Sequence, residues 1–115
     1  MEAIVLFSHG SVLCGSERNL LDLAERMRLR GDAPIVEAGF LNYSEPRFAD
    51  AVERCAARGA TRILIAPYFL IPGKFVVEDL PAAIAEVAAQ HPDLEFVTAD
   101  VIGFHPLIEE AILAS

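Results

Sequence analysis

Hydrophobic positions along the chain follow two alternating periods. Short runs of apolar and β-branched residues predict buried strands, and apolar residues recurring every three or four positions predict helices between them. The strand runs show little polar alternation, which is typical of parallel strands covered on both faces. The predicted strands are residues 3–8, 34–41, 61–69 and 94–101.

A helix is predicted after each strand. The expected starts are Ser16 as an N-cap, Pro46, Asp79 or its neighbours, and Pro106, and Gly31 and Gly59 end the first two helices. The predicted inner faces are Leu20, Leu23, Ala24 and Met27; Phe48, Ala51, Val52 and Cys55; Leu80, Ile84, Val87 and Ala88; and Leu107, Ile108, Ala111 and Ile112.

The alternating order of strands and helices predicts an α/β fold with a four-stranded parallel sheet, flanking helices and right-handed crossovers. We expect residues 1–115 to form a single domain, because the sequence contains no linker, internal repeat or low-complexity tract. A four-stranded sheet is small for this class, so a second copy of the chain is expected to complete one edge or face.

Composition excludes several kinds of partner. The net charge is −8 and no basic stripe is present, so nucleic acid is not an expected partner. The apolar stretches are too short to cross a bilayer, and residues 2–8 read as a strand where a signal peptide would have its basic and apolar regions. We therefore expect a cytoplasmic protein.

The two cysteines, Cys14 and Cys55, do not have the close spacing of a metal-binding knuckle. Cys55 is expected in the core, and Cys14 lies in a loop near His9.

Ligands of open parallel sheets bind outside the carboxyl ends of the strands. The loops at that edge are "HGSVLCGS", "LNYSEP", "LIPGKFVVED" and "IGFHP". His9 and His105 lie in these loops, whereas His91 lies at the opposite edge and is expected to be a surface residue.

The first of these loops does not fit a nucleotide site. Gly10 and Gly15 have the spacing of a phosphate loop, but Ser16 and Glu17 follow where such a loop needs a lysine and a hydroxyl. A flavin phosphate held by backbone N–H groups stays open as an alternative. His9 itself ends a strand, beside a glycine that permits close approach, and a neutral imidazole is both a metal ligand and a base.

Four segments together resemble the sirohydrochlorin cobaltochelatase family in its short, single-repeat form. They are "HGS", "GFLNYSEPRFADAV", "GATRILIAPYFLIPGKFVVEDLP" and "GFHPLIEEAI". The resemblance implies a chelatase-like half-domain that pairs as a homodimer. It also implies insertion of cobalt or iron into sirohydrochlorin, a tetrapyrrole rich in carboxylates, without a nucleotide.

Site residues follow from this resemblance. His9 matches the family's first-strand histidine, as metal ligand or proton acceptor. The family usually has a second histidine where this chain has Phe75, and often a glutamate where it has Asn42. Further candidate metal ligands are His105 and Glu45, and the residues predicted to contact the substrate are Ser11, Asn42, Tyr43, Lys74 and Phe75.

Each of these candidates has a structural alternative. His105 could be the N-cap of the last helix, and Glu45 could interact with the N-terminus of the second helix. Asp79 is the expected N-cap of the third helix, with Glu78 as a weaker metal candidate, and Lys74 could be a solvated surface residue. A non-catalytic protein that binds a tetrapyrrole or metal on the same scaffold is the alternative function, and a flavin-binding domain is a third.

Overall fold

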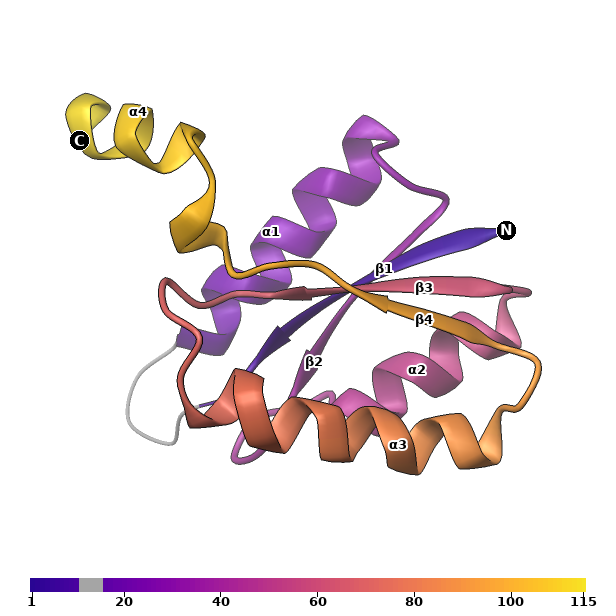
Figure 1. The fold of residues 1–115 in the computed structure, drawn as a ribbon. Coiled ribbons are helices and arrows are strands. Elements are labelled where there is room, and N and C mark those ends of the chain that lie inside the picture. The colour runs from indigo at the N-terminus through magenta and orange to yellow at the C-terminus, as the bar shows by residue number, and fades with distance from the viewer. Residues whose placement is uncertain (11–15) are drawn as a thin grey trace.

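The computed structural model describes residues 1–10 and 16–115 and contains four parallel strands with helices on both faces of the sheet (Figure 1). The predicted α/β architecture is therefore confirmed. In chain order the elements are β1 (Glu2–Ser8), α1 (Ser16–Arg30), β2 (Ile35–Phe40), α2 (Phe48–Ala57), β3 (Arg62–Pro67), the π-helical turn η1 (Phe75–Asp79), α3 (Leu80–Gln90), β4 (Glu95–Thr98), the 3-10 turn η2 (Ile102–Phe104) and α4 (Leu107–Ala114).

The strand order is β2-β1-β3-β4, with all three strand pairs parallel. Residue Leu6 of β1 lies between Ala38 of β2 and Ala66 of β3, so the three side chains share one face of the sheet. Phe7 points to the other face. Because all the strands run in parallel, their carboxyl ends and the loops that follow them gather at one edge.

The two faces of the sheet have separate cores. On one face α2 and α3 cover Val5, Phe7, Ile63 and Ile65, all inaccessible to solvent. The other face packs against Leu20 and Ala24 of α1, as the helical periodicity predicted. The predicted inner face of α2 is also confirmed, since Phe48, Ala51, Val52 and Cys55 are all buried.

Cover on the α1 side is uneven. Leu64 and Val97 are in register on β3 and β4, and both are only partly buried. Ile63 and Ile65, whose side chains point to the opposite face of β3, are fully buried. Helix α1 therefore covers β1 and β2 but leaves apolar side chains of β3 and β4 partly accessible.

One predicted helix start and one predicted helix cap are wrong. Pro46 does not open α2; its carbonyl accepts a hydrogen bond from the Phe40 N–H (2.9 Å), and the helix begins at Phe48. Helix α3 begins at Leu80, next to Asp79 as predicted, but the Asp79 side chain does not cap it, because helical backbone already runs through η1 before it. Its carboxylate instead binds the Lys74 ammonium (3.0 Å).

Helix α4 projects from the body of the molecule on the same side as α1 (Figure 1). Its predicted inner residues Leu107 and Ile112 are 60% and 68% exposed, so the expectation of an inward face is not met within one chain. None of the helices in the described residues is long and apolar enough to cross a membrane.

Candidate functional site

His9 follows β1 directly and lies at the carboxyl edge of the sheet, where its residue is exposed. The carbonyl of His9 accepts a hydrogen bond from the Asn42 N–H (2.9 Å), so the loops after β1 and β2 are joined at this point. Gly10 makes this approach possible. Its φ is +89°, and a Cβ there would overlap the Asn42 carbonyl.

An aromatic stack supports the His9 imidazole. The ring of Phe75 lies almost parallel to it, with centroids 4.8 Å apart and an interplanar angle of 12°. Phe69 lies 6.0 Å from Phe75 and 6.1 Å from His9. Phe69 also contacts Phe7 in the core, at 6.0 Å. The stack therefore connects His9 to the sheet through packed rings.

The turn η1 places Phe75 over His9. The loop after β3 leads into this π-helical turn, where Val76 and Val77 both donate backbone hydrogen bonds to the Gly73 carbonyl. π-Helical turns inside helices occur frequently at functional sites. The neighbouring Lys74 pairs with Asp79, so much of its positive charge is balanced locally, although its side chain stays 68% exposed.

The loop after β2 forms a second wall beside His9. Tyr43 has φ +67° and is 67% exposed, so its ring stands out into solvent at the edge of the sheet. Ser44 beneath it is buried, whereas Asn42 and Glu45 are exposed. Asp50, rather than Glu45, accepts the hydrogen bond from the Arg47 N–H (3.2 Å) at the start of α2. The predicted role of Glu45 at that helix start is therefore taken by Asp50.

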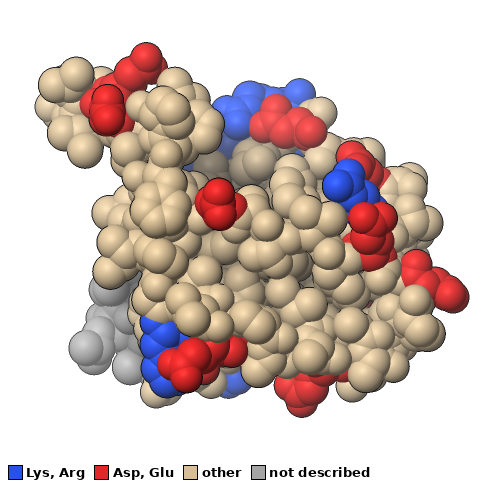
Figure 2. Space-filling model, in the orientation of Figure 1, with Lys and Arg blue, Asp and Glu red and all other residues tan. Residues whose placement is uncertain are grey.

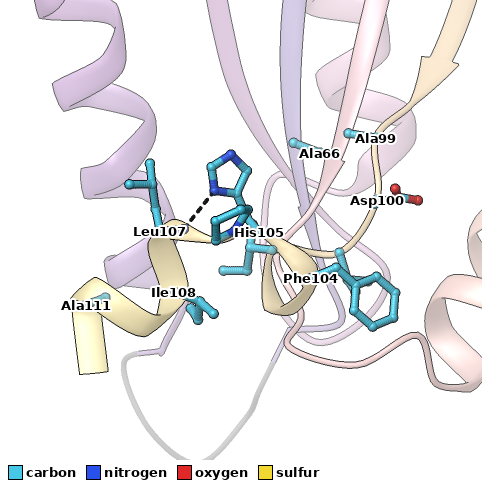
Figure 3. A pocket seen from close by; sticks show the side chains of 11 residues that line it. Ala66, Ala99, Asp100, Phe104, His105, Leu107, Ile108 and Ala111 are labelled. Atoms are coloured by element: carbon cyan, nitrogen blue, oxygen red, sulfur yellow. Dashed lines mark hydrogen bonds between the residues drawn. The ribbon is translucent and has the colours of Figure 1, made fainter. Parts of the chain in front are cut away.

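His105 caps the start of α4. Its Nδ1 accepts a hydrogen bond from the Leu107 N–H (3.1 Å), as Figure 3 shows. A neutral imidazole whose Nδ1 accepts carries its proton on Nε2, and that nitrogen then has no lone pair for a metal. In this geometry His105 could bind a metal only after giving up the cap, so its role as a ligand stays a prediction.

The remaining titratable side chains separate into structural and exposed groups. Burial raises the pKa of the Cys55 thiol to about 12, with a further contribution from the Glu37 carboxylate, so this thiol is inert at neutral pH. His91 contacts Glu53 (2.7 Å) at the far edge of the sheet, as a surface histidine was expected to do. Within residues 1–10 and 16–115, no three His, Cys, Asp or Glu side chains are close enough together to hold a metal ion.

A large groove lies apart from His9. Its volume is about 590 Å³, and it is bounded by Ala66 and Ala99 of the sheet region and by Leu107, Ile108 and Ala111 of α4 (Figure 3). Ala66 packs against the core under α1, whereas the rings beside His9 pack against the core under α2 and α3. The groove and the imidazole therefore belong to opposite faces of the sheet.

The structure brings together some of the predicted site residues but not all of them. His9 and Phe75 are in contact, with the backbone of Asn42 beside them and Lys74 next in sequence to Phe75. Ser11 and Cys14 lie outside the described residues.

The sequence analysis did not identify Phe69 as a site residue, although the aromatic residues of "PYFL" at the end of a strand were a visible signal. Other exposed apolar side chains in the neighbouring loops were also missed, namely Tyr68, Leu70, Ile71 and Val77.

Comparisons with known proteins point to one family. The model of the CbiX family matches residues 3–115. The sirohydrochlorin cobaltochelatase of Methanocaldococcus jannaschii is 40% identical over 91 residues, which are 79% of this chain and 64% of that protein.

Solved structures agree on the fold. The sirohydrochlorin chelatase SirB from Bacillus subtilis subspecies spizizenii, in complex with cobalt, superposes with a TM-score of 0.89 at 26% identity, over 98% of this chain and 48% of that one. The CbiX protein from Marinobacter aquaeolei VT8 gives a TM-score of 0.83 at 25% identity, over 99% and 92% of the two chains. This chain thus spans less than two thirds of the M. jannaschii protein and about half of SirB, and the predicted chelatase-like fold is confirmed.

Proposed function

Because the chain belongs to the CbiX family, we propose that it is a metal chelatase, a lyase that inserts cobalt(II) or iron(II) into sirohydrochlorin in cobalamin or siroheme biosynthesis. The observation that carries this proposal is the exposed His9 imidazole, stacked on Phe75 at the open carboxyl edge of the sheet. Relatives in the family are named as cobaltochelatases and ferrochelatases, which supports both metals as candidates.

Stacking and metal binding use different parts of the imidazole ring. Phe75 covers a face of the ring, whereas the lone pairs of the nitrogens lie in the ring plane. A nitrogen at the ring edge therefore stays available to a divalent metal while the ring is held in place. Phe75 cannot bind the metal, so it supports the ligand beside it.

A single imidazole is suited to a metal that has to leave. One protein ligand leaves the other coordination positions to water and to the incoming pyrrole nitrogens. The described residues offer no cluster of three ligating side chains that would trap the ion. His9 thus delivers a substrate metal, and the candidate ligands His105 and Glu45 lie on separate loops.

Insertion also has to remove protons. Each turnover forms bonds from the metal to four pyrrole nitrogens and releases two N–H protons from the macrocycle. A neutral His9 can accept one of these protons while the metal is not bound to its free nitrogen, and the other proton passes to solvent water. Ligand and base are thus two roles of the same ring, taken at different steps or by different copies of the chain.

The macrocycle itself needs a flat apolar surface and a few polar contacts. The rings of Phe69 and Phe75 and the exposed Tyr43 provide aromatic surface around His9. Lys74 lies beside Phe75 as a counter-charge for substrate carboxylates, and we place Ser11 and Asn42 among the polar contacts. Binding of a carboxylate by Lys74 would have to compete with Asp79.

We further propose that residues 1–115 act as one chelatase-like domain and that two copies pair as a homodimer in the cytoplasm. The match to about half of SirB supports this pairing, because one copy supplies one lobe of that size. The reaction as written needs no nucleotide, and the acidic surface makes nucleic acid an unsuitable partner.

Anaerobic absorbance of sirohydrochlorin mixed with cobalt(II) tests the proposal. The samples are the native protein, His9→Ala, His91→Ala and buffer without protein. We expect native protein and His91→Ala to accelerate insertion alike, and His9→Ala to fall to within about 10-fold of the buffer rate. His91 is the matched control because it is a histidine at the opposite edge of the sheet.

A different result would support the alternative function. If the native protein shifts the macrocycle spectrum but matches the buffer rate with both cobalt and iron, the chain is a non-catalytic tetrapyrrole-binding protein. If His9→Ala keeps the native rate, insertion does not depend on this imidazole, and the mechanism above is wrong.

A further inference from the structure

An ion pair spans the π-helical turn η1, through which the loop after β3 enters α3. The Lys74 ammonium lies 3.0 Å and 3.1 Å from the two carboxylate oxygens of Asp79. Lys74 directly precedes η1, and Asp79 is its last residue. Over this turn Figure 2 shows basic and acidic side chains side by side, on a face that is mostly uncharged. The pair therefore ties the beginning of the turn to its end.

The spacing of the pair matches the π-helical register. In an α-helix, side chains three or four positions apart are neighbours, and side chains five positions apart point about 140° apart around the axis. A π-helix closes its hydrogen bonds between residues five apart, as the bond from the Leu80 N–H to the Phe75 carbonyl does here. Lys74 and Asp79 are also five apart, so their contact favours the π-helical turn over a regular α-helical one.

The π-helical turn positions Phe75 against His9. Phe75 is the first residue of η1, and its ring is stacked on the imidazole with centroids 4.8 Å apart. The other end of the turn leads into Leu80, which is buried in the core. Because the Leu80 end is fixed, a change of register in η1 would move the Phe75 ring relative to His9. The ion pair thus contributes to the stack, although neither of its charged groups belongs to it.

The pair is exposed enough to exchange partners. The Lys74 side chain is 68% exposed, and that of Asp79 is 24% exposed. Ion pairs at such positions contribute little to stability. A carboxylate of a bound ligand can therefore replace Asp79 at the Lys74 ammonium, and the turn then loses the contact that favours its π-helical register.

We propose that Asp79 is a positioning residue that holds Lys74 in the free protein and thereby keeps Phe75 stacked on the imidazole. A carboxylate of the substrate takes Lys74 from Asp79 and so releases the stack. This inference rests on the proposed function, because it takes the ligand to be a macrocycle rich in carboxylates. Arrival of the substrate then frees the Phe75 ring to pack on the macrocycle and uncovers a face of the His9 imidazole.

Proton NMR of the protein without metal or macrocycle reads the stack directly. An aromatic ring shifts the resonances of protons stacked on its face, so the His9 ring protons should resonate upfield of those of an unstacked histidine. Phe75→Ala should remove most of this difference. The chain has three histidines, and His9→Ala assigns the signal. We expect Lys74→Met and Asp79→Asn each to reduce the upfield shift by about half or more, as the unstacked population grows.

A carboxylate ligand without an aromatic ring tests the exchange of partners. Tricarballylate, a flexible tricarboxylate, should reduce the upfield shift in the native protein at fixed pH and ionic strength, and it should have no effect on Lys74→Met. Asp32→Asn is the matched control, because it removes an exposed carboxylate that is paired with Arg30 (2.7 Å) near the end of α1. This variant should keep both the native shift and the native response.

Binding of metal-free sirohydrochlorin adds a second readout. Asp79→Asn should bind the macrocycle about 3-fold more tightly, because Lys74 no longer has a competing carboxylate, and Lys74→Met should bind it about 3-fold more weakly. The double variant should bind like Lys74→Met, because Asp79 acts only through Lys74. A merely structural role of Asp79 would give weaker binding in Asp79→Asn.

Three outcomes overturn the inference: a His9 shift that both variants leave unchanged, a native shift that does not respond to tricarballylate, or weaker binding of the macrocycle by Asp79→Asn. Cobalt insertion by the native protein separates the two proposals. Unchanged shifts in a protein that inserts cobalt remove the role of the ion pair and keep the chelatase function. Altered shifts in a protein that inserts nothing keep the effect of the ion pair on the stack and remove metal insertion.

Discussion

Phe75 lays the face of its ring against the His9 imidazole, and this contact suggests a test at the scale of one side chain. We expect Phe75→Ala to weaken binding of sirohydrochlorin by about 10-fold, because the loss of an aromatic contact costs about 1 to 1.5 kcal/mol. Phe75→Tyr keeps the ring and should stay within about 2-fold of the native affinity. Fluorescence titration with the metal-free macrocycle measures both.

The substitution Phe75→His gives a complementary prediction. The two ring centroids are 4.8 Å apart in the native protein, so modest side-chain rotation would let two imidazoles share one metal. We expect cobalt(II) to bind at least about 10-fold more tightly, since a second ligand is added to the same ion. Calorimetry with cobalt alone measures this, and an unchanged affinity would mean that the backbone of η1 holds residue 75 too far away.

The buried Cys55 thiol should make the free energy of unfolding depend on pH. Its thiol has a pKa of about 12 in the folded protein against 9.0 ordinarily, because burial disfavours the thiolate. Below pH 9 the thiol keeps its proton in both the folded and the unfolded state. Between pH 9 and pH 12 it ionises mainly in the unfolded chain. The free energy of unfolding should therefore fall as pH rises from 9 toward 12, by at most about 1.4 kcal/mol per pH unit.

Urea unfolding at a series of pH values checks this slope in a Cys14→Ser background. Cys55→Ala should remove the alkaline component of the slope while lowering stability at every pH through the cavity it leaves. A slope that is the same with and without Cys55 would assign the alkaline destabilisation to other groups.

At the scale of elements, Gly10 controls how the loop after β1 meets the loop after β2. Gly10→Ala combines a strained positive φ with overlap against the Asn42 carbonyl, and we expect it to cost about 2 kcal/mol or more. Because His9 is the adjacent residue, cobalt insertion should also fall. Gly73→Ala is the matched control: a Cβ there meets nothing within 4 Å, and stability should change by less than about 0.5 kcal/mol. Thermal unfolding and insertion rates distinguish the two glycines.

The arrangement of strands and helices was predictable because periodicity reports directly on burial. Ile63 and Ile65 read as a strand covered by helices and are fully buried, and the apolar stripe of α2 from Phe48 to Cys55 is likewise inside. Local sequence signals misplaced the start of α2 and the cap of α3. Pro46 and Asp79 both look like helix starts, but a backbone hydrogen bond from Phe40 holds the first and the Lys74 ammonium holds the second.

The candidate site was predictable only in part, for a similar reason. The position of His9 at a strand end followed from topology alone. Its stacking on Phe75 and Phe69 depends on a π-helical turn that has no sequence signature, because the turn arises from how the loop after β3 joins α3. The cap formed by His105 was foreseen as an alternative, and it is the contact observed.

For the whole molecule, charge opposes substrate binding. The net charge of −8 repels a macrocycle that carries several carboxylates, and the ammonium of Lys74 is largely balanced by Asp79. Salt screens this repulsion over about 10 Å at 0.1 M. We therefore expect the association rate of sirohydrochlorin to rise about 3-fold or more between ~0.01 and ~0.2 M NaCl.

Stopped-flow fluorescence measures that rate, with a neutral ester of the macrocycle as the control that salt should leave unchanged. A rate that falls with added salt would mean that local positive charge near His9 outweighs the net charge of the chain.

Because lysine is rare in this chain, the site around His9 can be probed by lysine-specific reactions. Lys74 is the only lysine in the sequence, and its side chain is largely exposed beside the aromatic stack. A lysine-specific protease therefore has a single peptide bond to cut, the one between Lys74 and Phe75. Bound macrocycle would shield that bond, so the rate of appearance of two fragments on a gel reports occupancy of the site without any turnover. The deprotonated amine of Lys74, like the N-terminal amine, also reacts with an amine-reactive fluorophore, so the chain can carry a probe beside Phe75 without an engineered attachment point.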